Sequence, residues 1–159
     1  MKQLVFDLDD TILMQGSYTS YDDIKVNNSI IQLFNRIPNK KYLYTNGTYG
    51  HGVNSLKSLQ LTEYFQDIFA RDNLNCMKPS RISFNLVNNL IQHKHNENDN
   101  PEFIFFDDIL ENLYMANMIG WETVWIHKDY KYAQKLPFVD LAFPTIEQAL
   151  YTLQLNNRI

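Results

Sequence analysis

The chain has 159 residues, of which 45% are hydrophobic, 14% aromatic and 20% charged, and its formal net charge is -4. This length and composition fit one globular domain with a sizeable core, and they exclude collagenous, proline-rich and wholly disordered chains. The negative charge excludes a histone-like or polybasic role, so any contact with nucleic acid would need a local basic patch.

The cysteine content and the N-terminal residues bear on the compartment. Cys76 is the only cysteine, so it has no partner for an internal disulfide, which is typical of a reducing compartment. The N-terminus reaches Asp7 after a short apolar run, which is not the apolar region of a signal peptide. No segment contains the roughly 18 apolar residues of a membrane span. We therefore expect a cytoplasmic protein with no membrane partner.

Short apolar runs alternate with stretches of helical periodicity, which is typical of strand-helix-strand units around a parallel sheet. In chain order, the pattern predicts strands at residues 4–6, 42–44, 67–70, 103–106, 123–126 and 141–143. It predicts helices at residues 24–37, 53–61, 82–91, 110–118 and from 145 to about 153, and a polar loop at 92–101. The expected fold is α/β, a three-layer Rossmann-like parallel sheet in a single domain over residues 1–159.

Three of the expected strands are followed directly by polar clusters. Asp7 to Thr11 follow the first strand, Thr45 to Gly47 follow the second, and Asp107 and Asp108 follow the fourth. The carboxyl ends of parallel strands lie along one edge of a sheet, so these clusters should converge on one site. Neighbouring carboxylates repel one another at neutral pH unless a cation lies among them, and hard oxygen ligands suit Mg2+. We therefore expect a bound Mg2+ ion.

The residue types in these clusters suit phosphate chemistry. In Asp7-x-Asp9, both carboxylates can face the space beyond the strand end, where one attacks phosphorus and the other transfers a proton. A phosphate would be held by the Thr45 hydroxyl, by the backbone N-H groups of Asn46 and Gly47, and by a cation. Lys78, just before Pro79 at an expected helix start, is the best candidate for that cation; the nearby alternatives are Lys57 and Arg81.

Four short motifs stand in the order that is typical of one enzyme family. They are Phe6-Asp7-Leu8-Asp9-Asp10-Thr11, Leu43-Tyr44-Thr45-Asn46-Gly47, Lys78-Pro79 and Phe105-Phe106-Asp107-Asp108. On these motifs the chain, from about Leu4 to about His127, resembles the haloacid dehalogenase-like (HAD) hydrolase superfamily. Within it, the chain looks most like the pyrimidine 5'-nucleotidase-type phosphatases, on Asp107-Asp108-x-x-Glu111-Asn112 and Gly120-Trp121-Glu122-Thr123.

The resemblance implies a Mg2+-dependent phosphomonoester hydrolase that works through an aspartyl-phosphate. Asp7 would be the nucleophile, and Asp9 would protonate the leaving oxygen and then deprotonate the hydrolytic water. Mg2+ would be bound by the Asp7 carboxylate, the Asp9 backbone carbonyl and Asp107. Asp108 would bind the metal through water or support the other ligands. Thr45 and Lys78 would bind the phosphoryl group.

The chain departs from the nucleotidase pattern between the first and second motifs. Those enzymes carry a helical cap domain at this point, whereas here only the 33 residues from Ile12 to Tyr44 separate the motifs. Residues 13–23 can form a flap but not a cap domain. An open site admits bulk water, so it discriminates between substrates less strongly by excluding water. The nucleotide specificity of those enzymes therefore does not transfer directly to this chain.

Several functions remain compatible with these motifs. The substrate can be a nucleotide or another small phosphate ester, or a macromolecule such as a phosphoprotein or a nucleic-acid end, and a second copy of the chain can cover the open site. A non-catalytic receiver-type phosphoacceptor domain also uses acidic residues, Thr and Lys around Mg2+. The pair Asp7 and Asp9 disfavours a receiver, because a proton-transferring carboxylate promotes turnover. A binding module without catalysis is disfavoured because every expected catalytic group is present.

Two further features lie outside these motifs. His51, between Gly50 and Gly52, follows the second motif, and we hypothesise that it contacts the leaving group. Residues 127–135 interleave lysines with tyrosines, a pattern found in surfaces that bind single-stranded nucleic acid. A solvated loop explains that segment better from sequence alone.

Overall fold

A parallel sheet of six strands forms the centre of the computed structural model, which describes residues 1–95 and 101–159. The strand order is β3-β2-β1-β4-β5-β6, and every neighbouring pair is parallel. The strands are β1 (Gln3–Phe6), β2 (Lys41–Tyr44), β3 (Phe65–Phe69), β4 (Phe103–Asp107), β5 (Glu122–Ile126) and β6 (Leu141–Phe143). The α/β, Rossmann-like architecture expected from the sequence is confirmed.

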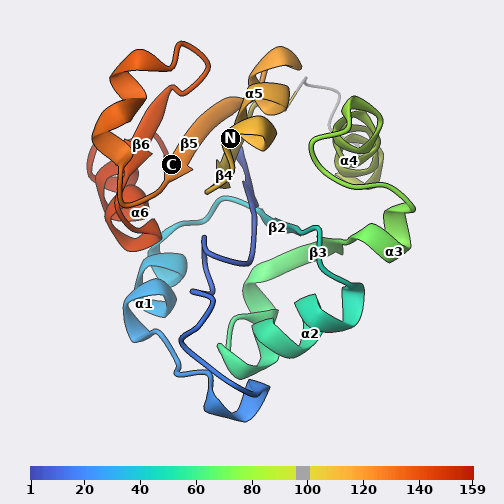
Figure 1. Ribbon diagram of the computed structural model, residues 1–159, viewed down its shortest axis with the longest axis vertical. Helices are drawn as coiled ribbons and strands as arrows, with labels where there is room; N and C mark the ends of the chain where they lie inside the picture. The colour runs from blue at the N-terminus through green and yellow to red at the C-terminus, as the bar shows by residue number, and fades with distance from the viewer. Residues whose placement is uncertain (96–100) are drawn as a thin grey trace.

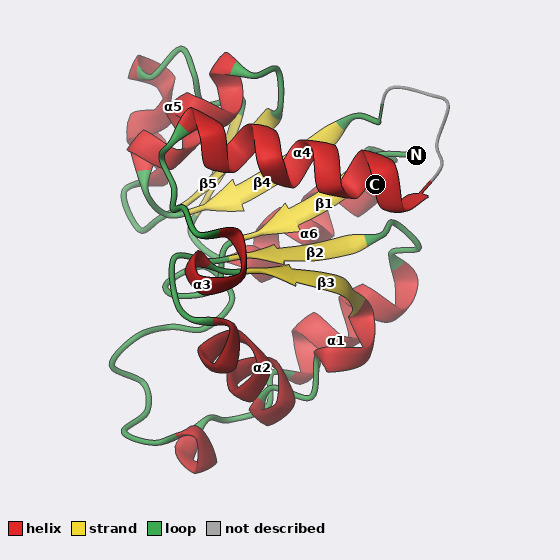
Figure 2. Ribbon diagram, turned by 90° about the vertical axis from the view of Figure 1, so that its right-hand side faces the viewer, coloured by secondary structure: helices red, strands yellow, loops and turns green. Residues whose placement is uncertain are grey.

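Helices cover both faces of the sheet and complete three layers. They are α1 (Asn28–Arg36), α2 (Tyr49–Ser58), α3 (Arg71–Leu74), α4 (Arg81–His95), α5 (Leu110–Met118) and α6 (Ile146–Leu155), with the 3-10 turns η1 (Tyr21–Asp23), η2 (Thr62–Tyr64) and η3 (Tyr130–Lys135). One face packs against α1, α2 and α6, and the other packs against α3, α4 and α5. Figure 2 shows α4 in front of the strands and α6 behind them. Among the described residues, no helix combines the length and apolar character that a bilayer crossing requires.

Side-chain alternation along the strands divides the core into two halves. Phe6 points to the α1 side, where its ring stacks on Phe106 with centroids 4.6 Å apart, whereas Val5 points to the α4 side. On the α4 side, the Phe84 ring meets Phe105 and Trp121 edge to face, each at 5.5 Å. Both faces of the central strands β1 and β4 are therefore buried, which explains their nearly continuous apolar sequences.

Polar side chains at the helix starts explain where two expected boundaries were wrong. The helix expected over residues 24–37 begins at Asn28, because the Asn27 side chain accepts hydrogen bonds from the N-H groups of Ser29 and Ile30. The helix expected from Val53 begins at Tyr49, after the cap Thr48, and ends before Leu59. At the last helix, Thr145 is the cap and accepts from the N-H of Gln148, as the spacing predicts.

The helix after Pro79 differs from the prediction in its buried face and in its end. Ile82, expected in the apolar stripe, is 74% exposed, and Phe84 is buried instead. The helix continues to His95, although a loop was expected from residue 92. Polar side chains at 92–94 are compatible with a surface helix, so their polarity alone did not mark the end. The remainder of the expected loop, residues 96–100, lies outside the described residues.

The parallel arrangement places the carboxyl ends of all strands along one edge, toward which the strand arrows point in Figure 2. The chain that leaves β1 passes through the expected flap, residues 13–23, into η1, which lies against α2 (Figure 1). This edge, with the flap beside it, is where the polar clusters of the sequence lie.

Candidate active site

Three carboxylates and one lysine meet beyond the ends of β1 and β4. The Lys78 ammonium lies 2.7 Å from Asp7 Oδ1 and 2.8 Å from Asp107 Oδ2, and only 1% of the lysine side chain is exposed. Carboxylate oxygens of Asp7, Asp107 and Asp108 all lie within 4.8 Å of one another. The structure therefore brings together four of the residues that the sequence assigned to one site.

Each of these groups is held by its own structural element. The Asp7 N-H donates to the Phe106 carbonyl at 2.9 Å, which continues the pairing of β1 with β4 by one residue. Asp107 accepts hydrogen bonds from the Ile109 N-H at 2.8 Å and from Asn112 Nδ2 at 3.0 Å, so the start of α5 orients this carboxylate. The sheet thus fixes the backbone positions, and the α5 segment fixes one side chain.

Lys78 reaches the carboxylates over an aromatic floor. Its ammonium lies 5.1 Å from the ring centroid of Tyr44 and 5.3 Å from that of Phe105. The Asn46 side chain holds the lysine backbone from both sides: it accepts from the Lys78 N-H at 2.8 Å and donates to the Lys78 carbonyl at 2.9 Å. The alternative cations Lys57 and Arg81 are exposed. Asn46 therefore positions the lysine through its side chain, a role that its place beside Thr45 did not reveal.

The cluster holds more negative than positive charge. Burial raises the pKa of Asp7 to about 8, although Lys78 acts in the opposite direction, and burial together with Asp107 raises the pKa of Asp108 to about 6. Burial alone would lower the pKa of Lys78, but its contacts with Asp107 and Asp7 outweigh burial and raise it. The lysine is thus charged at neutral pH. The repulsion among the buried carboxylates is relieved either when one of them keeps its proton or when a cation binds between them.

The donor set fits a hard divalent cation. The three carboxylate oxygens close to one another are the ligand type that Mg2+ prefers, and no sulfur or imidazole competes in this group. About 11% of the Asp7 side chain is exposed, so the group is buried but reachable. Asp7, Asp107 and Asp108 are therefore able to hold a metal ion.

Asp9 is not part of the group of three close carboxylates, and it interacts with a histidine. His51 Nε2 lies 3.0 and 3.1 Å from the two Asp9 carboxylate oxygens, and His51 Nδ1 lies 2.8 Å from the Tyr21 hydroxyl. A neutral ring with its hydrogen on Nε2 satisfies both contacts, because it donates to Asp9 and accepts from Tyr21. His51 therefore links Asp9 to the flap through protein groups on both ring nitrogens.

The second motif has an internal hydrogen bond. Thr45 is buried, and its Oγ1 accepts the N-H of Gly47 at 3.0 Å. A Cβ on Gly47 would come within 2.9 Å of the His51 ring, so a larger residue at this position would displace the histidine. The motif thus shapes the wall next to Asp9.

Sequence reasoning gave no role to three residues that contact the predicted site. Thr11 donates through Oγ1 to Asp7 Oδ2 at 3.2 Å, Asn112 donates to Asp107, and Tyr21 contacts His51. Thr11 and Asn112 belong to the motifs given above, so the sequence indicated that they lie near the site. It did not indicate which residues they contact. Tyr21 carried no signal, because its contact depends on how the flap folds against α2.

A cavity of about 390 Å3 opens beside the carboxylates. Its lining includes Asp10, Thr11 and Asp108, together with Met14 of the flap and Lys128. The flap turn is held by Asp10, whose Oδ1 accepts the N-H of Gln15 at 2.8 Å. The cavity gives space next to the site for a group attached to a phosphate.

Comparison with solved structures identifies the fold. A HAD phosphatase from Thermococcus onnurineus is 19% identical, with a TM-score of 0.67 over 99% of this chain and 98% of that one. The candidate HAD-hydrolase YfnB of Bacillus subtilis, solved bound to magnesium, is 15% identical, with a TM-score of 0.69 over 96% and 98%. L-2-haloacid dehalogenase from Xanthobacter autotrophicus is 12% identical, with a TM-score of 0.62 over 84% of this chain and 63% of that one.

These likenesses show that the chain has the HAD-like fold, as the motifs indicated. No family model matches the chain, and no curated protein matches it in sequence. The solved neighbours include both a phosphatase and a dehalogenase, so the fold by itself does not select a substrate.

Proposed function

We propose that the chain is a HAD-like phosphatase, a Mg2+-dependent phosphomonoester hydrolase that acts through an aspartyl-phosphate on Asp7. The observation that carries this proposal is the buried lysine bridge: the Lys78 ammonium contacts both Asp7 and Asp107 at the end of the parallel strands. A dehalogenase has no need of the surrounding excess of carboxylates, whereas a metal-assisted phosphoryl transfer uses it.

Mg2+ would be held by the carboxylates of Asp7 and Asp107 and by the Asp9 backbone carbonyl, with Asp108 bound through water or in support. When bound, this ion supplies positive charge that neutralises the phosphoryl oxygens and the crowded carboxylates. YfnB, which has the same fold, was solved bound to magnesium, and this supports the choice of metal.

The proposed reaction has two balanced steps. An Asp7 oxygen attacks phosphorus, the P-O bond to the leaving group breaks, and Asp9 gives its proton to the leaving oxygen. Water then attacks the same phosphorus, the bond between phosphorus and Asp7 breaks, and Asp9 takes the proton of the water. The contacts of Lys78 and Thr11 with Asp7 support this assignment, because they fix the carboxylate for in-line attack.

Positive and polar groups next to Asp7 are suited to the transferred phosphoryl group. Lys78 offers charge, and Thr45 offers its hydroxyl hydrogen while its oxygen accepts from Gly47. Asn46 acts on the phosphate through Lys78, whose backbone it holds. The proposed machinery is therefore compact, and the cavity beside it is left for the rest of the substrate.

Replacement of Asp7 tests the proposal. In Asp7→Asn the nucleophilic oxygen is lost, so we expect hydrolysis of p-nitrophenyl phosphate to fall by about 10^3-fold or more while the fold is retained. The measurement is the rate with and without Mg2+, together with the circular dichroism spectrum. Glu63→Gln, the same carboxylate-to-amide change at an exposed position in η2, should keep the wild-type rate.

Two results would contradict the proposal. Substantial Mg2+-dependent hydrolysis by Asp7→Asn would exclude Asp7 as the nucleophile. A wild-type protein that accumulates a long-lived acyl phosphate without turnover would favour the receiver-type alternative.

A further inference from the structure

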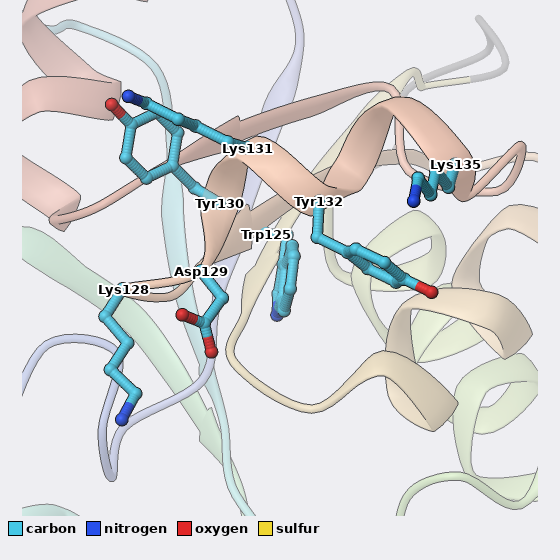
Figure 3. A pocket seen from close by; sticks show the side chains of 7 residues that line it. All are labelled: Trp125, Lys128, Asp129, Tyr130, Lys131, Tyr132 and Lys135. Carbon is cyan, nitrogen blue, oxygen red and sulfur yellow. The ribbon is translucent and has the colours of Figure 1, made fainter.

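A second pocket, of about 800 Å3, lies on the surface formed by β5 and the segment that follows it (Figure 3). Trp125 lies at its centre, and residues 128–132 and 135 surround it. We call this the lysine-tyrosine pocket. The proposed phosphatase chemistry uses none of these side chains, so the pocket requires its own explanation.

The pocket is positively charged although the whole chain is negative. Its lining contains three lysines, Lys128, Lys131 and Lys135, and one acidic residue, Asp129, so its formal charge is +2 (three minus one), against -4 for the chain. Within the described residues, the ion pairs of the structure do not involve these three lysines, whereas Asp129 lies 3.7 Å from His127. Such a patch attracts anions locally, which the sequence charge as a whole does not.

Aromatic rings lie among the lysines. The Tyr132 side chain is on the surface, with the residue 53% exposed, and the Lys135 ammonium lies 5.3 Å from its ring centroid. Tyr130 is half-buried, and Figure 3 shows Tyr130 and Tyr132 on opposite sides of Trp125. Alternating cations and accessible rings suit a chain of phosphates and unpaired bases, because phosphates pair with lysines and bases stack on rings.

Two residues, Trp125 and Lys128, connect the pocket with the candidate active site. Trp125 pairs with Asp107 across β4 and β5, and its indole N-H donates to the Asp108 carbonyl at 2.9 Å. Lys128 lines both this pocket and the 390 Å3 cavity beside the carboxylates. A ligand that enters the cavity can therefore continue onto the lysine-tyrosine pocket.

We propose that the lysine-tyrosine pocket binds single-stranded nucleic acid and presents its terminal phosphate to Asp7. This inference rests on the proposed phosphatase function and names its substrate class, the phosphorylated end of a single-stranded nucleic acid. Hydrolysis consumes one water and leaves inorganic phosphate and a chain with a free hydroxyl. A single strand is favoured over a duplex, because a duplex hides the base faces that the tyrosines would stack on.

Binding is measured separately from hydrolysis, by fluorescence anisotropy of dye-labelled single strands that carry no terminal phosphate. One strand is DNA and one is RNA, and each has about 12 nucleotides, a length within the range of known single-strand sites. For three phosphate contacts, the logarithm of the affinity should fall against the logarithm of the salt concentration with a slope of about -2. Lys128→Glu and Lys131→Glu should each weaken binding about tenfold, and Tyr132→Ala about fivefold. Lys57→Glu, the same charge reversal at an exposed site on α2, should stay within about twofold of the wild type.

The outcomes separate the binding surface from the chemistry. Absence of binding would overturn the pocket assignment, and so would equal weakening of binding by Lys131→Glu and Lys57→Glu. A blunt duplex of equal length that binds as tightly as the single strand would overturn it as well. The DNA and RNA arms show which nucleic acid is preferred.

A second measurement compares the hydrolysis of 5'- and 3'-phosphorylated single strands with that of the matching mononucleotides. We expect a kcat/KM about tenfold higher for the longer substrate, lost in Lys131→Glu. Hydrolysis of p-nitrophenyl phosphate without this preference would overturn the inference and leave the proposed function standing. Oligonucleotide binding without hydrolysis of any phosphate ester would refute the phosphatase proposal and keep the binding surface.

Discussion

At the scale of single residues, His51 stands out because both of its ring nitrogens have protein partners. The histidine joins Asp9, the proposed acid and base, to Tyr21 of η1. The sequence suggested a contact with the leaving group, and the structure adds a contact of the ring with the Asp9 carboxylate. We therefore expect His51 to be a positioning residue and to contribute to rate more than to substrate binding.

Substitution of His51 should lower kcat and leave KM almost unchanged. We expect His51→Ala to reduce kcat for p-nitrophenyl phosphate about 10- to 100-fold, because Asp9 loses its orientation. His51→Gln places an amide near the position of Nε2 and should recover much of the rate. The measurement is a set of Michaelis curves on several phosphate esters, with the exposed His93→Gln on α4 as the control.

The two roles give different substrate patterns. A positioning histidine lowers kcat by the same factor for every ester, whereas a leaving-group contact changes the factor from one leaving group to another. Unchanged kinetics of His51→Ala on all esters would reject both roles.

At the scale of elements, α2 shows how closely the site-bearing helix packs on the sheet. A Cβ on Gly52 would lie 3.1 Å from Ile68 Cγ2 and 3.4 Å from Leu43 Cδ2, so the helix approaches β2 and β3 at the distance that glycine permits. Gly50, two residues earlier on the same helix, is exposed, and a Cβ there would have nothing within 4 Å. These two glycines therefore have different structural roles.

The two glycines provide a matched pair of substitutions. Gly50→Ala should increase the free energy of unfolding by about 0.5 kcal/mol, because alanine favours the helix. Gly52→Ala should decrease it by about 1–2 kcal/mol, because the added methyl group overfills the contact with the sheet. Denaturant unfolding of both variants measures the difference, and equal effects of the two substitutions would contradict the close approach of α2.

At the scale of the whole molecule, the buried carboxylates couple stability to pH and to metal. The pKa of Asp7 is raised to about 8 and that of Asp108 to about 6, so the folded protein keeps protons that the unfolded chain loses above about pH 4. A raised pKa gives stability that is fully present below the unfolded value and is lost as the pH rises through the folded value. The metal-free protein should therefore lose stability between about pH 4 and pH 8.

Added Mg2+ should restore this stability, because the cation takes the place of the protons. We expect the increase in Tm caused by millimolar Mg2+ to be small near about pH 5 and larger near about pH 8. Thermal unfolding with EDTA or with Mg2+ across this range measures it. Asp7→Asn removes one titrating group and should flatten the dependence, whereas an increase in Tm that is independent of pH in the wild type would contradict the coupling.

The sequence by itself determined the fold class, the strand centres and the polar residues of the site. Apolar runs such as Phe103 to Phe106 bury both faces of a strand and have few alternative structures, and Asp7 and Asp107 stand directly at strand ends. Lys78, expected at a helix start, lies in the turn before α4, which begins at Arg81. Parallel topology then brings the strand ends to one edge, which is a general property of such sheets. Helix boundaries were less well determined, because a single cap such as Asn27 moves a helix start without changing the apolar pattern.

Only the tertiary structure decided which side chains of the site touch one another. Whether His51 contacts Asp9 depends on how α2 packs on the sheet, and the contact of Tyr21 depends on where the flap folds. The pocket around Trp125 forms because the turns of η3 bring lysines and tyrosines of one segment around a buried ring. The physical reason is that such contacts depend on how separate elements pack on one another, whereas local patterns report only which residues are buried and which end an element.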